Sequence, residues 1–205
     1  MAFGISCKSS LNMKKQAYLN FRASQKSFKT DDGIIKYLDK GNSDKVVLLL
    51  HGIPTSGWLY RKMIDSLVEQ DFRVIAPDML GFGSSDSPKG YEIYNSEKQA
   101  QRIIDLMNHL KIKNWCHVTH DVGGLWTWEL MKVSPEKIKS LVILNAIIFD
   151  EGFNPPVRMK KGPFAKIAMS MYHSWLTNGI MMKSLFKIGL KNHKLSKSDL
   201  YGYKK

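Results

Sequence analysis

The sequence predicts an α/β fold with a mostly parallel sheet, because short apolar runs alternate with segments of helical periodicity. Val46–Leu50 is a continuous apolar run, typical of a strand covered on both faces. Between Ser96 and Leu110, apolar residues recur at helical spacing. The alternation continues as far as Asn145, which indicates parallel strands joined by right-handed crossovers.

Each element has its own pattern. A hairpin is expected first, from Ser27–Thr30 and Ile34–Leu38, because Asp31-Asp32-Gly33 between them is a strong turn signal. The apolar runs predict strands at Val46–Leu50, Phe72–Ala76, Trp115–Thr119 and Ile138–Leu144, and the helical patterns cover Leu59–Glu69, Ser96–Leu110 and Leu125–Lys132.

The chain divides into three parts by composition. Residues 1–26 form a basic lead-in, residues 27–149 the α/β core, and residues 150–205 a Met-rich, helix-leaning segment that resembles a cap. The 205 residues, 43% of them hydrophobic, suffice for one globular domain.

The net charge of +13 lies mostly at the two ends of the chain. Residues 1–45 hold 9 Lys/Arg against 4 Asp/Glu, residues 46–149 hold 11 of each, and residues 150–205 hold 11 against 3. This distribution favours a solvated basic surface, while an anionic partner or membrane surface stays the alternative. No nucleic-acid motif occurs, so no nucleic-acid partner is expected.

Targeting and ligand signals are few. No apolar run reaches the ~20 residues of a membrane span, which speaks against membrane association. Met1–Cys7 is too short for a signal-peptide core, so a cytoplasmic location is expected. Gly4-Ile5-Ser6-Cys7 resembles the end of a lipoprotein signal, so a lipidated envelope protein is the alternative if the true start lies upstream of Cys7.

The two cysteines give no disulfide framework, and the six histidines lack metal-ligand spacing. Neither a cofactor nor a metal is therefore expected.

Three turns follow directly after predicted strands, where reactive groups of an α/β sheet collect. They are His51-Gly52-Ile53-Pro54, the glycine-containing loop Asp78–Asp86, and Thr119-His120-Asp121-Val122-Gly123-Gly124. The third joins a strand to a helix and places an acidic residue between small ones, the context of a nucleophile elbow. The other interpretation of Asp121 is an N-cap of the Leu125–Lys132 helix.

Together, the HGIP, DMLGFGSSDSP and THDVGG segments resemble the α/β-hydrolase superfamily, in particular its haloalkane dehalogenase and epoxide hydrolase branch. The similarity runs from about Ser27 to Asn154, and no G-x-S-x-G motif of serine esterases occurs. The resemblance implies an α/β-hydrolase core with an opening hairpin, followed by the start of a helical cap.

The resemblance also implies a mechanism on a small apolar substrate. Asp121 would displace halide or open an epoxide and form a covalent ester, which water activated by a histidine would hydrolyse. Backbone N–H groups of Ile53 and Val122 would form the oxyanion hole. His51, Gly52, Pro54, His120 and Gly123 match positions that shape the turns, and Asp78 and Asp86 are expected to brace their loop rather than react. His109 and His117 are expected at element ends or on the surface.

The sequence departs from the resemblance at three points. Dehalogenases of this branch usually have Trp after the nucleophile and often a polar residue after His-Gly, where this chain has Val122 and Ile53. In the family that this chain resembles, the last strands, the catalytic acid and the base histidine follow the cap. A position that supplies the acid in some members is Asn145 here, and neither Asp150 nor Glu151 fits a motif. We therefore expect a fragment or truncated product that lacks the C-terminal strands, acid and base, with a non-catalytic binding protein as the alternative function.

Overall fold

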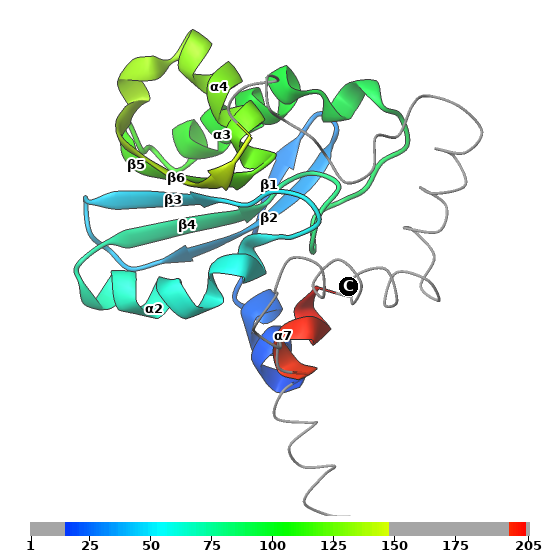
Figure 1. Cartoon of the computed structure of the whole chain (residues 1–205), viewed down its shortest axis with the longest axis vertical. Coiled ribbons are helices and arrows are strands. Elements are labelled where there is room, and N and C mark those ends of the chain that lie inside the picture. Colours follow the sequence, from blue (N-terminus) through cyan, green and yellow to red (C-terminus); the bar gives the residue numbers. More distant parts are fainter. Residues whose placement is uncertain (1–14, 148–196, 204–205) are drawn as a thin grey trace, which may run out of the picture. The chain divides into compact units, whose positions relative to one another are not determined.

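The computed structural model describes residues 15–147 and 197–203 (Figure 1). The chain forms two compact units, one of residues 1–19 with 151–205 and one of residues 20–150. In the first unit, the short helix α7 (Lys197–Gly202) carries Tyr201, whose ring packs edge-on against Tyr18 at 5.8 Å between centroids. Apart from residues 197–203, the predicted cap-like segment lies outside the described residues.

The second unit contains one sheet, in the order β1-β2-β4-β3-β5-β6. Its strands are β1 (Lys26–Thr30), β2 (Gly33–Lys40), β3 (Val46–Leu50), β4 (Arg73–Asp78), β5 (Trp115–Asp121) and β6 (Ile138–Ala146). β1 and β2 form the predicted antiparallel hairpin, and β2 is also antiparallel to β4. β4, β3, β5 and β6 are mutually parallel, which confirms the predicted α/β class.

Helices cover both faces of this sheet (Figure 1). They are α2 (Arg61–Glu69), α3 (Ser96–His109) and α4 (Gly123–Val133), with short 3-10 turns at η1 (Gly57–Tyr60), η2 (Glu92–Tyr94) and η3 (Pro135–Lys137). α3 begins at a side-chain cap, because Asn95 Oδ1 accepts from the Lys98 N–H at 2.8 Å. A further helix at residues 15–23 lies in the stretch expected to be a lead-in. None of the described helices has the length and apolar character needed to cross a membrane.

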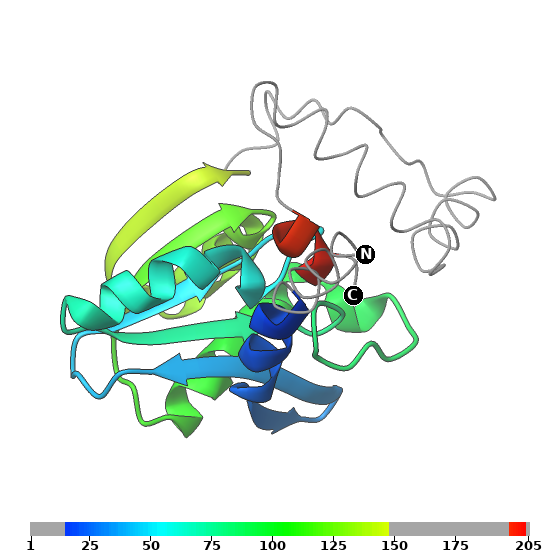
Figure 2. The ribbon, with the colours of Figure 1, turned by 90° about the horizontal axis from the view of Figure 1, so that it is seen from below.

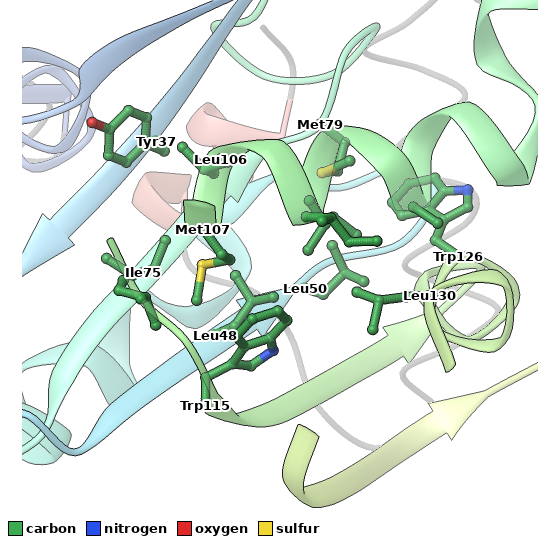
Figure 3. Packing of buried hydrophobic residues seen from close by; sticks show 14 of the residues in the cluster. Tyr37, Leu48, Leu50, Ile75, Met79, Leu106, Met107, Trp115, Trp126 and Leu130 are labelled. Carbon is green, nitrogen blue, oxygen red and sulfur yellow. The ribbon is translucent and has the colours of Figure 1, made fainter. Parts of the chain in front are cut away.

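β3 divides the core into two layers. Leu48 and Leu50 point toward α3 and α4 and belong to the larger cluster, which Figure 3 shows around Trp115. Val47 and Leu49 belong to the cluster on the α2 side. All five β3 residues are buried, as their continuous apolar run predicts, so this strand is the centre of the fold.

A buried carboxylate organises the loop after β4. Asp78 is 2% exposed; its Oδ1 accepts from the Gly57 N–H at 2.8 Å, and its Oδ2 accepts from the Ser84 N–H at 2.8 Å and Gln25 Nε2 at 3.0 Å. Burial raises the pKa of this carboxyl group. Gly83 lies so close that a Cβ there would sit 2.2 Å from Asp78 Oδ2. The loop is therefore wrapped around the carboxylate.

The far end of the same loop is fastened to β2. Asp86 Oδ2 accepts from the Ile34 N–H at 2.8 Å, and the Asp86 N–H donates back to the Ile34 carbonyl at 2.9 Å. Ser85 Oγ accepts from the Lys36 N–H at 2.8 Å. Asp78 and Asp86 thus hold the loop in place, as expected from the sequence.

A buried hydrogen-bond chain ties α4 to β5. Trp115 Nε1–H donates to His117 Nδ1 at 3.1 Å, so the ring proton of His117 lies on Nε2 and is donated to Thr127 Oγ1 at 2.9 Å. The Thr127 hydroxyl then donates to the Gly123 carbonyl at 2.8 Å. His117 is fully buried, so its expected place at the surface or an element end was wrong. Its partners explain the burial, since both ring nitrogens are satisfied inside the core.

The burial of His117 makes stability depend on pH. Burial lowers the pKa of His117 from 6.5 to about 3. Between pH 6.5 and pH 3, His117 is therefore protonated in the unfolded chain and neutral in the folded protein. The free energy of unfolding should therefore fall as pH falls below 6.5, with His117 contributing up to ~1.4 kcal/mol per pH unit.

His117→Gln removes this titration while keeping an acceptor for Trp115 and a donor for Thr127. Urea unfolding at pH 7 and pH 5 should show a smaller loss of stability in this variant than in the wild-type protein. His109→Gln, at an exposed position, is the matched control and should keep the wild-type pH dependence. Equal slopes for His117→Gln and wild type would contradict the assignment.

Candidate active site

Asp121 lies at the junction of β5 and α4, where the chain turns sharply from strand to helix. Its φ is +54°, in the left-handed region that non-glycine residues rarely adopt. The Asp121 carbonyl accepts from the Ile147 N–H at 3.0 Å, and the Val122 carbonyl accepts from the Leu125 N–H at 2.9 Å. These bonds hold a sharp turn that presents the Asp121 side chain beyond the end of the strand.

The carboxylate of Asp121 is held by the turn after the neighbouring strand. Ile53, in the turn that follows β3, donates its backbone N–H to Asp121 Oδ1 at 2.9 Å. Among the described residues, no hydrogen bond reaches Asp121 Oδ2. One carboxylate oxygen is therefore fixed by a backbone donor, and the other is not engaged within the described part of the chain.

Val122, not Asp121, occupies the N-cap position of α4, and no side-chain hydrogen bond caps the helix. The alternative interpretation of Asp121 as a helix cap is therefore wrong, because its carboxylate contacts the Ile53 amide instead. The Val122 side chain is partly buried against the larger core cluster.

Two glycines allow the turns after β3 and β5 to approach each other. A Cβ on Gly52 would lie 2.4 Å from Asp121 Cβ and 2.6 Å from its Oδ1. A Cβ on Gly123 would lie 2.6 Å from the His51 carbonyl oxygen. Neither site has room for a side chain, so both glycines are needed for the contact between the turns.

His51 connects two of the three turns. The Met79 N–H donates to its Nε2 at 2.9 Å, so the ring proton lies on Nδ1 and is donated to the Gly52 carbonyl at 2.9 Å. Burial lowers the pKa of His51 to about 4, which keeps the ring neutral near pH 7. The ring also packs edge-on against Phe82 and Trp126, at centroid distances of 5.4 and 5.9 Å.

The Gly52 carbonyl is a common acceptor within the turn after β3. Besides His51 Nδ1, it accepts from the Thr55 N–H at 3.0 Å and from Thr55 Oγ1 at 2.9 Å. The Ile53–Pro54 peptide bond within the turn is cis. Met79 lies in the DMLGFGSSDSP segment and Thr55 directly follows HGIP, but the sequence does not predict that the Met79 amide and the Thr55 hydroxyl form these hydrogen bonds.

The remaining predicted positions lie close by but make fewer contacts. His120 is half-buried, and its Nδ1 is buried without a hydrogen-bond partner among the described residues. Asn145, near the end of β6, has a φ of +46° and precedes Ala146, which is in register with Asp121. Asp150 and Glu151 lie outside the described residues. Within the part of the chain that the structure describes, no three His, Cys, Asp or Glu side chains gather as a metal site.

Known proteins resemble this chain in sequence. The chain is 33% identical over 146 residues to a haloalkane dehalogenase of Mycolicibacterium paratuberculosis, covering 70% of this chain and 46% of that protein. It is 31% identical over 113 residues to bifunctional epoxide hydrolase 2 of Sus scrofa, covering 55% of this chain and 20% of that protein. The chain thus spans less than half the length of these two relatives.

The fold is shared with solved structures of the same kind. Epoxide hydrolase VrEH1 from Vigna radiata superposes with a TM-score of 0.69 at 23% identity, covering 88% of this chain and 65% of that one. Haloalkane dehalogenase DpaA from Paraglaciecola agarilytica superposes with a TM-score of 0.63 at 26% identity, covering 87% and 59%. Residues 45–181 match the sequence profile of the alpha/beta hydrolase fold. This chain belongs to the alpha/beta hydrolase fold family.

Proposed function

We propose that this chain is a hydrolase that uses Asp121 as a nucleophile and passes through a covalent alkyl ester on a small apolar epoxide or alkyl halide. The observation that carries the proposal is the fixed carboxylate. Asp121 sits at a left-handed elbow with Oδ1 held 2.9 Å from the Ile53 nitrogen. The names of the two similar proteins, a haloalkane dehalogenase and an epoxide hydrolase, support the two substrate classes of the proposal.

In the first step, Asp121 Oδ2 attacks an electrophilic sp³ carbon of the substrate. A new C–O bond forms as the carbon–halogen or carbon–oxygen bond breaks, and its electron pair leaves with the halide or the epoxide oxygen. An epoxide alkoxide then takes a proton from water. The Ile53 N–H restrains the carboxylate, so little rotational freedom is lost in reaching the transition state.

In the second step, water attacks Cγ of the ester. Negative charge then develops on Oδ1, the oxygen that already faces the Ile53 N–H in the free protein. A donor aimed at the developing charge stabilises this tetrahedral intermediate, and the Val122 backbone N–H is the second donor that we assign. The Cγ–Oδ2 bond then breaks, Oδ2 leaves with the alkyl group as the alcohol, and the oxygen of the attacking water takes its place in the Asp121 carboxylate. Of the two protons of that water, one goes to the alcohol and the other to solvent, where in the epoxide reaction it neutralises the hydroxide left by the first step.

Two buried histidines do not supply the base for the second step. His51 and His117 each have both ring nitrogens in hydrogen bonds, and burial lowers their pKa values to about 4 and about 3. We assign the base to no described residue. The described residues therefore provide for formation of the ester but not for its hydrolysis, and we expect the ester to be detectable.

The side chains beside Asp121 favour an epoxide over a halide. Ile53, 47% exposed, and Val122 are both aliphatic, so neither has a side-chain donor for a departing halide ion. An epoxide oxygen stays attached to the product after ring opening and is neutralised by a proton, so it depends less on such a donor.

Intact-mass spectrometry after incubation with a short terminal epoxide or a short primary alkyl bromide tests the proposal. We expect one adduct per chain with the mass of the opened epoxide or the alkyl group, and peptide mapping should place it on Asp121. Asp121→Asn is the matched control, because the amide oxygen can still accept from Ile53 while its nucleophilicity is lost. An adduct that persists in Asp121→Asn would refute the nucleophile; no adduct with any substrate would favour the non-catalytic alternative.

Gly52→Ala tests whether the close approach of the two turns matters for the chemistry. The new methyl group must push Asp121 away from the Ile53 amide, because it would lie 2.4 Å from Asp121 Cβ, far below van der Waals distance. We expect ester formation to slow by at least about tenfold, as for a misplaced reacting group. Ile53→Ala is the control, because it keeps the backbone N–H; similar rates for the two variants would contradict this role of Gly52.

A further inference from the structure

Two polar side chains of α3, Gln99 and Arg102, are buried, at 1% and 4% exposure. They are three residues apart in the helix, so they lie on the same side of it. Burying an amide or a guanidinium costs free energy unless its polar atoms find partners. Neither side chain has a part in the mechanism proposed above, so their partners are the guide to their role.

The two side chains form a hydrogen-bond chain that ends on the loop after β4. Arg102 Nη2 donates to Asp32 Oδ2, in the turn between β1 and β2, and Arg102 Nη1 donates to Gln99 Oε1 at 3.1 Å. An arginine side chain can only donate, so it holds Gln99 with Oε1 toward itself. Gln99 Nε2 then donates to the Leu80 carbonyl at 3.1 Å. The β1–β2 hairpin, which forms one margin of the sheet (Figure 2, blue), is thus joined to the loop through α3.

The same segment of the loop contacts the turn after β3. Met79, next to Leu80, donates its N–H to His51 Nε2 at 2.9 Å, and the ring donates from Nδ1 to the Gly52 carbonyl at 2.9 Å. The next amide along the chain is that of Ile53, which holds the reactive carboxylate. Met79, Leu80 and His51 are each at most 1% exposed. Close packing of this kind leaves them little freedom to move independently.

We propose that Gln99 and Arg102 are positioning residues for the Asp121 carboxylate. They fix the Leu80 carbonyl and, with it, the Met79 amide on which His51 depends. The proposal rests on the proposed function, because the carboxylate that they place is the nucleophile of the ester-forming step. Neither residue touches the reacting atoms, so each acts through the loop after β4.

A second cluster of the hairpin provides a matched control. Asp39 on β2, with a side chain 6% exposed, pairs with Arg73 of β4 at 2.8 Å and with Lys26 of β1 at 2.7 Å. Among the described residues, this cluster makes no hydrogen bond to the loop after β4. Both Asp39 and Asp32 pair with an arginine, but only Asp32 belongs to the chain of bonds that reaches the loop.

The Ile53 amide resonance reports the position of the turn without any substrate. In protein labelled with ¹⁵N-isoleucine, the Ile53→Ala variant identifies this peak by its disappearance. Gln99→Met and Arg102→Met should each shift the peak, because the amide moves relative to Asp121 Oδ1. Arg102→Lys keeps a donor and a charge, so it should shift the peak less than Arg102→Met. Asp39→Asn should leave the peak in place, although it also loses charged partners.

The rate of ester formation tests the consequence for the chemistry. At saturating substrate, Gln99→Met should form the ester about threefold to tenfold more slowly. The half-saturating concentration should stay unchanged, because positioning affects the reaction step and not substrate binding. The double variant of Gln99→Met with Arg102→Met should be no slower than the slower single variant, since both act through one bond to Leu80.

Asp32→Asn gives the same test with a milder change, for the case that the α3 variants fold poorly. The Asp32 side chain is 28% exposed, and asparagine keeps an oxygen acceptor for Arg102 while removing the negative charge. We expect the Ile53 peak to shift in the same direction as in Arg102→Met, by a smaller amount.

Three results would overturn the proposal. An Ile53 peak that stays in place in both α3 variants would show that the loop does not transmit their loss. An equal shift in Asp39→Asn would reduce the effect to general destabilisation, and additive losses of rate in the double variant would show that Gln99 and Arg102 act separately. If the peak shifts as expected but no variant and no wild-type chain forms an ester, the positioning of the carboxylate stands and the nucleophile role of Asp121 falls.

Discussion

The hydrogen bond from the Ile53 amide to Asp121 Oδ1 is the contact on which the organisation of the site depends. It joins two turns that are 68 residues apart in the sequence and follow adjacent strands. It can form only because β3 and β5 are parallel neighbours, so that their carboxyl ends lie side by side. Gly52 and Gly123 then provide the space that the two turns need to touch.

Three buried polar side chains stabilise the elements that carry this contact. His51, Asp78 and His117 are each almost fully buried, and each is satisfied by specific donors and acceptors. In the low-dielectric interior, a lost partner would cost far more than a lost surface contact. Such groups favour the one arrangement of the turns in which every partner is satisfied.

Much of the fold follows from local patterns in the sequence. The bounds of β3 match the predicted strand, and α3 starts at the predicted residue and ends one residue early, because its apolar repeat and the Asn95 cap are local signals. For β4 the apolar run predicts Phe72–Ala76, whereas the strand runs from Arg73 through Pro77 to Asp78. Proline is a common strand terminator, yet Pro77 lies opposite Tyr37 of β2 within the sheet.

The features that the sequence does not predict depend on contacts with residues of other elements. The local pattern suggests a surface position for His117, but Thr127 of the following helix completes its hydrogen bonds inside the core. The helix at residues 15–23 lies in the predicted basic lead-in, and its Phe21 packs against Trp58 at 5.3 Å between ring centroids. The strand–turn–helix context is enough to predict the position of Asp121, whereas its bond to the Ile53 amide depends on the order of strands in the sheet.

The backbone and the side chain of residue 53 have separate roles, so the side chain can change in evolution without affecting the bond to Asp121. The bond to Asp121 uses the main chain, which every residue except proline provides, while the side chain is 47% exposed. Selection can therefore change the size or polarity of that side chain without removing the donor. A scaffold built in this way can change the surface beside Asp121 by single substitutions at position 53 while the Asp121 carboxylate stays anchored.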